Sequence, residues 1–280
     1  MARKPPGPKA AGLGAELRAI RKRLGLSMAE VATRLEWSES TVSRLETGHR
    51  NINSEEVSAL LAVYGVTGAE RDRLMAIART PDESSWIDTD LPGLPPTSIK
   101  LAMYEHDAVA ITDWSPLLIP GLLQTMEFSR AYMLSDGIPE AEVGARLMAR
   151  QRRQEILDRV AYTAFVDETV LTRQIGGPKI FSRQLRHLVE VAEEGVVTVR
   201  VTPGNSDGHA GLISPFILLE FELSAPIVHV ELARSGVFLT GQNDTAVYPA
   251  TVNRLDALSL DAEESVQRLR TAAGAIGSGT

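Results

Sequence analysis

The chain has 280 residues, of which 44% are hydrophobic, so its composition excludes wholesale disorder and its length predicts two domains. It contains no cysteine, which excludes disulfides, thiol catalysis and zinc held by cysteine. No stretch approaches the about 18 uninterrupted apolar residues of a membrane span, and the first residues form no apolar segment. We therefore expect a cytoplasmic protein with neither signal peptide nor membrane anchor.

The formal net charge of −7 is distributed unevenly along the chain. Residues 1–53 hold 10 Lys and Arg against 5 Asp and Glu, a net of +5, whereas residues 81–280 hold 16 against 27, a net of −11. The chain thus combines a basic N-terminal part with an acidic body. Attraction to nucleic-acid phosphates requires a local positive surface, so the negative total does not exclude DNA binding.

The basic part begins with a segment rich in proline and continues as helices. Residues 1–12 hold three prolines and two glycines and predict a flexible arm, which is either simply solvated or in contact with DNA phosphates. Leucine and isoleucine at helical spacing predict a helix over 13–24. Further helices are predicted over 54–64, with Ser54 as the N-cap, and over 68–79.

Two capped helices lie between these elements. Ser27 and Glu30 form a capping box that starts the first of them. Ala32 on its buried face is small enough to let another helix approach closely. After a tight turn, Ser38 caps the second helix, which ends at Gly48. Residues 13–79 therefore predict a compact all-α domain of five helices.

The second capped helix has an exposed stripe that is unusual for a surface helix. At 100° per residue, Val42 and Leu45 fall on one side. The opposite side holds short hydroxylated side chains and one arginine: Ser40, Ser43, Arg44 and Thr47. Small hydroxyls let a helix lie close to a base edge, and arginine pairs with guanine O6 and N7. A plain surface helix is the alternative, but the capped helix before it completes a helix-turn-helix unit, which favours DNA reading.

Residues 13–79, and above all LGLSMAEVATRLEWSESTVSRLETGHRNIN, resemble the XRE, or lambda-repressor-like, helix-turn-helix domains. The resemblance implies that bases are contacted from the start and outward positions of the second capped helix, at Ser38, Glu39, Ser40, Ser43 and Arg44. It implies phosphate contacts before and after the helix pair, at Ser27, Met28, His49, Arg50 and Asn51. It also implies a structural ion pair between Arg21 and Glu46.

The sequence departs from this family at two positions. The family usually has Gln where Met28 stands, so only backbone N–H groups remain for a phosphate there. It usually has Gly at positive φ where Glu36 stands, and a non-glycine residue is disfavoured in that conformation. Glu39 can accept from cytosine N4 but repels phosphates if misplaced. We therefore expect modest affinity per subunit, with dimerisation supplying the rest.

Residues 80–98 contain four prolines with acidic and small polar residues, and they predict an interdomain linker. Beyond it, residues 99–273 predict an α+β domain with a mostly antiparallel sheet, followed by a flexible tail at 274–280. The predicted helices cover 99–110, 125–135, 139–158, 179–194, 243–258 and 261–273, and the predicted strands cover 162–167, 196–202, 215–222 and 227–233.

No catalytic signature, metal site or cofactor motif is found in the acidic body. The loop GNSDGHAG at 204–211 suggests a metal or phosphate site, but a glycine-rich connection between strands explains it more simply. The stretch RLMARQRRQ at 146–154 is either a basic functional strip or a solvated helix face. Neither stretch identifies a reaction.

Segments of the body nevertheless resemble a known family. WSPLLIPGLLQTMEFSRAYM, RLMARQRRQEIL, FVDETVLTRQIGG, QLRHLVEVAEE and FILLEFE occur in the order found in the C-terminal domain, of uncharacterised function, in WhiJ-like actinobacterial regulators. Members are commonly encoded beside a small partner protein, which implies that this domain binds a protein. The resemblance covers residues 99–272 but assigns no role to single residues.

The sequence therefore predicts a transcriptional regulator that binds a double-stranded DNA operator as a homodimer and receives its signal from a small protein encoded by a neighbouring gene. A small-molecule effector acting on a one-component regulator is the first alternative. An enzyme anchored to DNA is the second, and it would need a convergent polar constellation that the sequence does not display.

Overall fold

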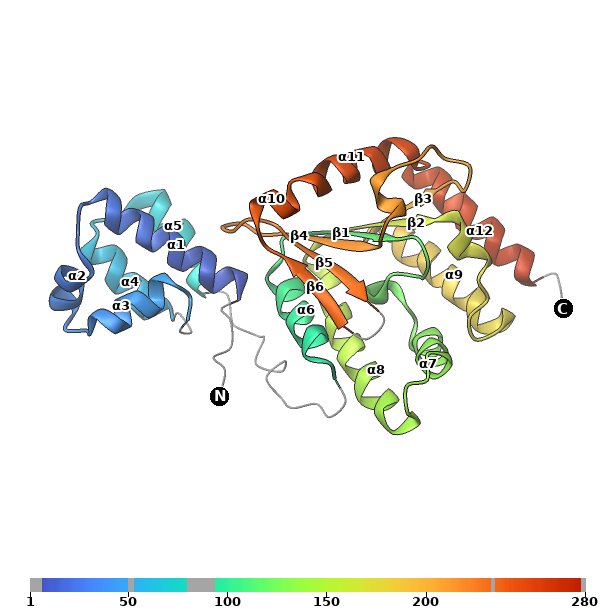
Figure 1. The fold of residues 1–280 in the computed structure, drawn as a ribbon, viewed down its shortest axis with the longest axis horizontal. Helices are drawn as coiled ribbons and strands as arrows, with labels where there is room; N and C mark the ends of the chain where they lie inside the picture. Colours follow the sequence, from blue (N-terminus) through green and yellow to red (C-terminus); the bar gives the residue numbers. More distant parts are fainter. Residues whose placement is uncertain (1–6, 50–52, 80–93, 233–234, 278–280) are drawn as a thin grey trace. The chain divides into compact units, whose positions relative to one another are not determined.

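The computed structural model describes residues 7–49, 53–79, 94–232 and 235–277 (Figure 1). The chain divides into two compact units. The first comprises residues 1–89 with the short segment 221–225, and the second comprises residues 90–220 and 226–280.

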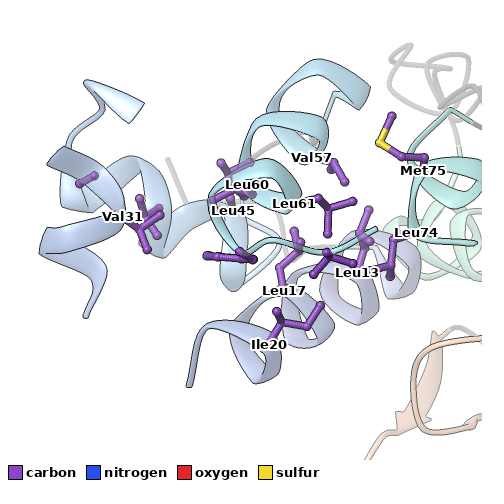
Figure 2. Packing of buried hydrophobic residues seen from close by; sticks show 14 residues of the cluster. Leu13, Leu17, Ile20, Val31, Leu45, Val57, Leu60, Leu61, Leu74 and Met75 are labelled. Carbon is purple, nitrogen blue, oxygen red and sulfur yellow. The ribbon is translucent and has the colours of Figure 1, made fainter. Parts of the chain in front are cut away.

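The first unit is built from helices around one apolar core. Its helices are α1 (Pro8–Arg23), α2 (Met28–Leu35), α3 (Glu39–Glu46), α4 (Ser54–Val63) and α5 (Gly68–Arg79). Figure 2 shows the core side chains converging from these helices. Its fully buried members include Leu17, Val31, Val42, Leu45, Val57, Leu60, Leu61 and Leu74.

Two local predictions for this unit were wrong. Helix α1 begins at Pro8, so residues 8–12 are helical and do not belong to a flexible arm, while residues 1–6 lie outside the described residues. Proline suits this place because the first helical N–H has no intrahelical partner. The N-cap of α4 is Asn53 and not Ser54, since the Asn53 side-chain oxygen accepts a hydrogen bond from Glu56 N at 2.7 Å.

The second unit contains a six-stranded sheet in the order β3-β2-β1-β4-β5-β6. Strands β1, β2 and β3 pair in parallel, whereas β1, β4, β5 and β6 pair antiparallel. The sheet is therefore mixed, and the prediction of a mostly antiparallel sheet was wrong. The strands are β1 (Ala110–Ser115), β2 (Ala161–Asp167), β3 (Thr198–Thr202), β4 (Phe216–Glu220), β5 (Ile227–Leu232) and β6 (Ser235–Leu239).

Helical crossovers explain the parallel half of the sheet. The helices α7 (Met126–Ser135) and α8 (Glu140–Gln154) lie between β1 and β2, and α9 (Pro178–Glu193) lies between β2 and β3. Each crossover brings the chain back to the end of the sheet at which the previous strand began, which parallel pairing requires. Among the described residues, the crossovers also contain the 3₁₀ turns η2 (Gly121–Leu123), η3 (Glu155–Asp158) and η4 (Glu168–Thr172), and η5 (Ala210–Leu212) lies between β3 and β4.

The remaining helices are α6 (Pro96–Asp107), α10 (Gln242–Thr245), α11 (Val247–Leu258) and α12 (Ala262–Gly277). The observed bounds of α6 and α12 correct the predicted boundaries of the linker and of the C-terminal tail. Residues 96–98 of the predicted linker belong to α6, and residues 80–93 lie outside the described part of the chain. Residues 274–277 of the predicted tail continue α12, and residues 278–280 are not described.

Helices pack on both faces of the sheet (Figure 1). On one face, Trp114, Phe165, Phe216 and Val228 form an apolar cluster with Leu255 of α11. Because side chains alternate along a strand, Asp113, Tyr162 and His229 belong to the other face, where polar groups are buried.

Candidate nucleic-acid interface

Helices α2 and α3 form a pair of capped helices joined by a tight turn. Ser27 Oγ accepts a hydrogen bond from Glu30 N at 3.1 Å, and the Glu30 carboxylate accepts from Ser27 N at 2.7 Å, which completes a capping box. Ser38 Oγ accepts from Thr41 N at 3.1 Å. Val31 and Ala32 are buried on the inner side of α2. Local hydrogen bonds therefore fix where both helices start.

Helix α3 buries one side and exposes the other. Val42 and Leu45 have no exposed surface. On the outer side, Ser40, Arg44 and Thr47 are exposed and Ser43 is half-buried. Arg44 Nε donates to the carbonyl oxygen of Ser40 at 3.1 Å, and Thr47 Oγ1 donates to that of Ser43 at 2.7 Å. In the free protein, the Arg44 and Thr47 side chains are thus hydrogen-bonded to backbone carbonyl groups of their own helix.

The other residues of the proposed DNA surface lie at the ends of the same two helices. Ser27, Ser38, Glu39 and His49 are exposed. Met28 is half-buried and packs against the apolar core, so its side chain points inward. The remaining two, Arg50 and Asn51, lie outside the described residues.

A buried ion pair fixes α3 on α1. Arg21 Nε and Nη2 donate to the two carboxylate oxygens of Glu46 at 2.5 and 2.8 Å, and Arg21 Nη1 donates to the carbonyl oxygen of Leu26 at 2.8 Å. The two residues are only 7% and 4% exposed. The hydrogen bond to Glu46 raises the pKa of the Arg21 guanidinium. Both charges are used inside the domain and are not available to DNA.

Two glycines let α1 approach α3 closely, a contact that was not predicted from the sequence. A Cβ on Gly14 would lie 2.5 Å from the carbonyl oxygen of Leu45. A Cβ on Gly48 would lie 2.7 Å from the backbone nitrogen of Ala11, and Gly48 also has φ of +68°. The available signal was an isolated glycine inside a helical pattern, which marks close packing.

The turn between α2 and α3 holds a strained residue. Glu36 has φ 56° and ψ 34°, and among the described residues it alone combines a side chain with positive φ. Its N–H donates to the carbonyl of Thr33 at 3.4 Å and closes α2. A left-handed residue at this place directs the chain into α3, so the conformation is needed although glycine would adopt it more easily.

The second unit buries charged and polar groups on the face of the sheet covered by α6 and α8. Arg153 Nε and Nη2 donate to the Glu105 carboxylate, each at 2.7 Å. Asp113 accepts from Ser115 Oγ at 2.7 Å and from Tyr162 Oη at 2.9 Å, and burial raises the pKa of its carboxyl to about 6. Burial lowers the pKa of His229 to about 4.

The two ambiguous stretches of the sequence take definite positions. In 146–154, Arg150 and Arg153 are half-buried and bonded, whereas Arg152 is exposed, so this face of α8 is not simply solvated. In 204–211, the His209 ring lies edge-on to Trp114 with centroids 5.2 Å apart. No group of three or more His, Cys, Asp or Glu placed to hold a metal occurs among the described residues.

Two family models match the chain. Residues 99–271 match the model described as Domain of unknown function (DUF5753), which covers more than half of the chain. The chain belongs to the DUF5753 family. In this DUF5753 protein, residues 12–74 match the model described as Helix-turn-helix domain, which is XRE-like. Both resemblances seen in the sequence are thereby confirmed.

The helix-turn-helix domain makes this DUF5753 protein a candidate DNA-binding regulator. Comparisons with curated proteins and with solved structures find no match. None of the described helices is long and apolar enough to cross a membrane.

Proposed function

We propose that the protein is a cytoplasmic, sequence-specific transcriptional regulator whose helix α3 enters the major groove of a double-stranded DNA operator. The observation that supports this most is the geometry of α3. Its buried side, Val42 and Leu45, fixes it in the domain, while the opposite side presents short hydroxyls and Arg44 to solvent. A capped helix before it, at a tight turn, is the arrangement that places such a stripe against base edges.

The proposal divides the exposed residues by role. Arg44 leaves its bond to the Ser40 carbonyl and donates two hydrogen bonds to guanine O6 and N7. Around it, bases are contacted by Ser38, Glu39, Ser40, Ser43 and Thr47. Phosphates are bound by Ser27, His49, Arg50, Asn51 and the backbone N–H of Met28, whose side chain packs in the core.

A homodimer supplies the second reading helix. A helix-turn-helix dimer binds two half-sites about one helical turn, or roughly 34 Å, apart on a pseudo-palindromic operator. The second unit supports this through strand β6, which lies at one end of the sheet. Its residues 235–239 include no charged residue and no proline, and Val237 is 45% exposed. Edge strands that do not pair with another chain usually carry a charged residue or a proline, which β6 lacks.

The opposite edge of the sheet is covered. The carbonyl of Val201 in β3 accepts from Leu260 N at 2.9 Å, and Val201 N donates to Ser265 Oγ at 2.9 Å. We therefore propose that β6 pairs antiparallel with β6 of a second copy of the chain, about a two-fold axis. Residues 81–280 have a net charge of −11, so two copies approach each other with least repulsion along a strand without charges.

The signal is proposed to come from a small partner protein, on the basis of the sequence resemblance of the DUF5753 domain. Co-purification of the tagged full-length chain with the product of its neighbouring gene tests this. Loss of the partner from the purified complex at physiological salt would instead favour a small-molecule effector.

Binding of labelled promoter fragments to the full-length chain tests the DNA proposal. Arg44→Ala is expected to cost about 1–3 kcal/mol and to relax the preference at one base pair. Arg50→Ala is expected to weaken binding to all sequences alike. Arg254→Ala, which removes an equal charge in the second unit, is the matched control. Equal losses for Arg44→Ala on every sequence would contradict a base contact.

The dimer has its own test. Val237→Lys places a charge in the middle of β6 and is expected to shift the protein to monomer in sedimentation velocity experiments. Val247→Lys is the matched control, because Val247 is 55% exposed and belongs to α11 instead of the edge strand. A dimer that survives Val237→Lys at the same concentration would exclude the β6 interface.

A further inference from the structure

Arg150 of α8 is a partly buried arginine without a carboxylate partner. Its Nη1 donates to the side-chain oxygen of Gln124 and, at 3.0 Å, to Ser129 Oγ, and both acceptors are neutral. Among the described residues, no carboxylate lies within 4 Å of this guanidinium. Burial lowers its pKa to about 10, and the neighbouring Arg153 charge adds to this effect. The folded domain thus holds a positive charge in a place that disfavours it.

Two other arginines of the protein, unlike Arg150, each have a carboxylate partner. Arg21 and Arg153 each use Nε and Nη2, which form one edge of the guanidinium, to hold a carboxylate in two parallel hydrogen bonds. At Arg150 the same edge is vacant. Its Nε is buried without a hydrogen-bond partner, and no hydrogen bond of its Nη2 to the described residues is formed. Among the described residues, Arg150 therefore differs from the other two in having no carboxylate side chain as a partner.

The guanidinium is held in position by a braced loop. Residues 119–125 follow the carboxyl end of the parallel strand β1, and Gln124 Nε2 donates to the carbonyl of Ile119 at 2.8 Å. Gln154 Nε2 donates to the carbonyls of Leu122 and Gln124, and Gln184 Nε2 donates to that of Leu123. A side chain fixed in this way loses little freedom when it binds a ligand.

The Nη2 end of this edge lies beside Gly121. A Cβ placed on Gly121 would meet a single heavy atom within 4 Å, and that atom is Arg150 Nη2 at 3.9 Å. In open α/β sheets, ligands bind beyond the carboxyl ends of parallel strands, where strand order changes direction. Strand β1 is such a place, since it pairs in parallel with β2 and antiparallel with β4.

The neighbouring charged side chains do not pair with Arg150. Arg153 is neutralised by Glu105, so its charge is not available to a ligand. The Glu231 carboxylate lies on β5 and is exposed, and it raises the pKa of Arg150 through space without forming an ion pair. Tyr132 acts in the same direction. Glu231 weakens the attraction for an anion at Arg150 but does not fill the vacant edge.

We propose that the Nε and Nη2 edge of Arg150 binds a carboxylate of a ligand, which completes the pairing seen at Arg21 and Arg153. The carboxylate belongs either to a small organic acid or to a peptide C-terminus of a protein partner. The binding itself is independent of DNA recognition. A regulatory role for this site rests on the function proposed above.

Calorimetric titration of the full-length chain at low salt tests the proposal. The probes are succinate, a short peptide with a free C-terminal carboxylate, the same peptide amidated at its C-terminus, and inorganic phosphate. Arg150→Gln is expected to weaken carboxylate binding by about tenfold or more. Arg152→Gln, which removes an exposed charge from the same helix, is expected to change it by less than about twofold.

If Arg150→Gln does not fold, Glu231→Gln provides a second test of the same site. Removing this negative charge is expected to tighten carboxylate binding about twofold or more. Saturable binding of succinate identifies a small acid as the source, and binding of the free peptide alone identifies a protein terminus. No binding of either carboxylate, equal binding of the amidated peptide, phosphate binding alone, or an unchanged affinity in Glu231→Gln would overturn the proposal. Operator binding measured on the same samples separates this failure from that of the proposed function.

Discussion

Removing one partner of the Arg21–Glu46 pair is expected to destabilise the helix-turn-helix domain severely. Glu46→Leu leaves a guanidinium with 7% exposure facing an apolar neighbour, with only the Leu26 carbonyl as a remaining acceptor. Arg21→Met leaves the Glu46 carboxylate buried without its two donors at 2.5 and 2.8 Å. Each change leaves one buried charge without its partner, which is expected to lower the unfolding free energy by about 3–5 kcal/mol.

This loss is comparable with the whole stability of the domain. At about 0.05–0.15 kcal/mol per residue, the helices over residues 8–79 have roughly 4–11 kcal/mol of unfolding free energy. Each single variant is therefore expected to leave α1 and α3 open for a measurable fraction of the time. The double variant Arg21→Met with Glu46→Leu removes both charges together, and it is expected to cost much less than the sum of the two single changes.

Hydrogen exchange of the full-length protein, followed by mass spectrometry, measures these energies locally. Peptides from α1 and α3 report the opening of the first unit, and peptides from α9 serve as the internal reference. We expect fast exchange in α1 and α3 for each single variant and recovered protection in the double variant. Single changes that cost less than about 1 kcal/mol, or losses that simply add, would refute the reasoning.

Three further outcomes follow from single positions. Gly14→Ala puts a Cβ 2.5 Å from the backbone oxygen of Leu45 and is expected to cost about 1–3 kcal/mol by the same exchange assay, whereas Gly144→Ala, in open space on α8, should be neutral or stabilising. Glu36→Gly is expected to stabilise α2 by up to about 1 kcal/mol in that assay, because φ of 56° suits glycine; slower opening of the wild type would contradict this. Asp113 has a folded pKa of about 6 against an ordinary 3.8, so its contribution to stability falls as pH rises between these values. His229 has a folded pKa of about 4 against 6.5, so its contribution falls as pH drops through that range. The two effects oppose each other, and Asp113→Asn is therefore expected to make thermal stability rise more steeply from pH 4 to 6.5; an unchanged slope would contradict the assignment.

The helix-turn-helix unit was predictable because its signals are local. The capping box of Ser27 and Glu30 and the cap at Ser38 lie within three residues of the groups they bond. The left-handed conformation at Glu36 was anticipated only through the family resemblance, since glutamate itself gives no sign of it. The close approach of α1 at Gly14 depends on a backbone atom of Leu45, and no local pattern encodes that distance.

The second unit was harder to predict because its strands break the usual pattern. Strand β1 contains Asp113, whose buried carboxyl is satisfied by Tyr162 from the next strand. A charged residue in a buried strand has no strand signal, so β1 was missed and with it the parallel pairing to β2. The role of Arg150 rests on Gln124, 26 residues away, and the sequence of α8 alone does not reveal this contact.

The most direct test of the account is the affinity of the full-length protein for its own promoter region compared with random DNA of equal length. Both are measured by fluorescence anisotropy at the same salt concentration, with and without the neighbouring gene product. The account predicts a preference of about 10³-fold or more for one promoter fragment, and a loss of affinity as salt rises. Equal affinity for promoter and random DNA under both conditions would contradict it.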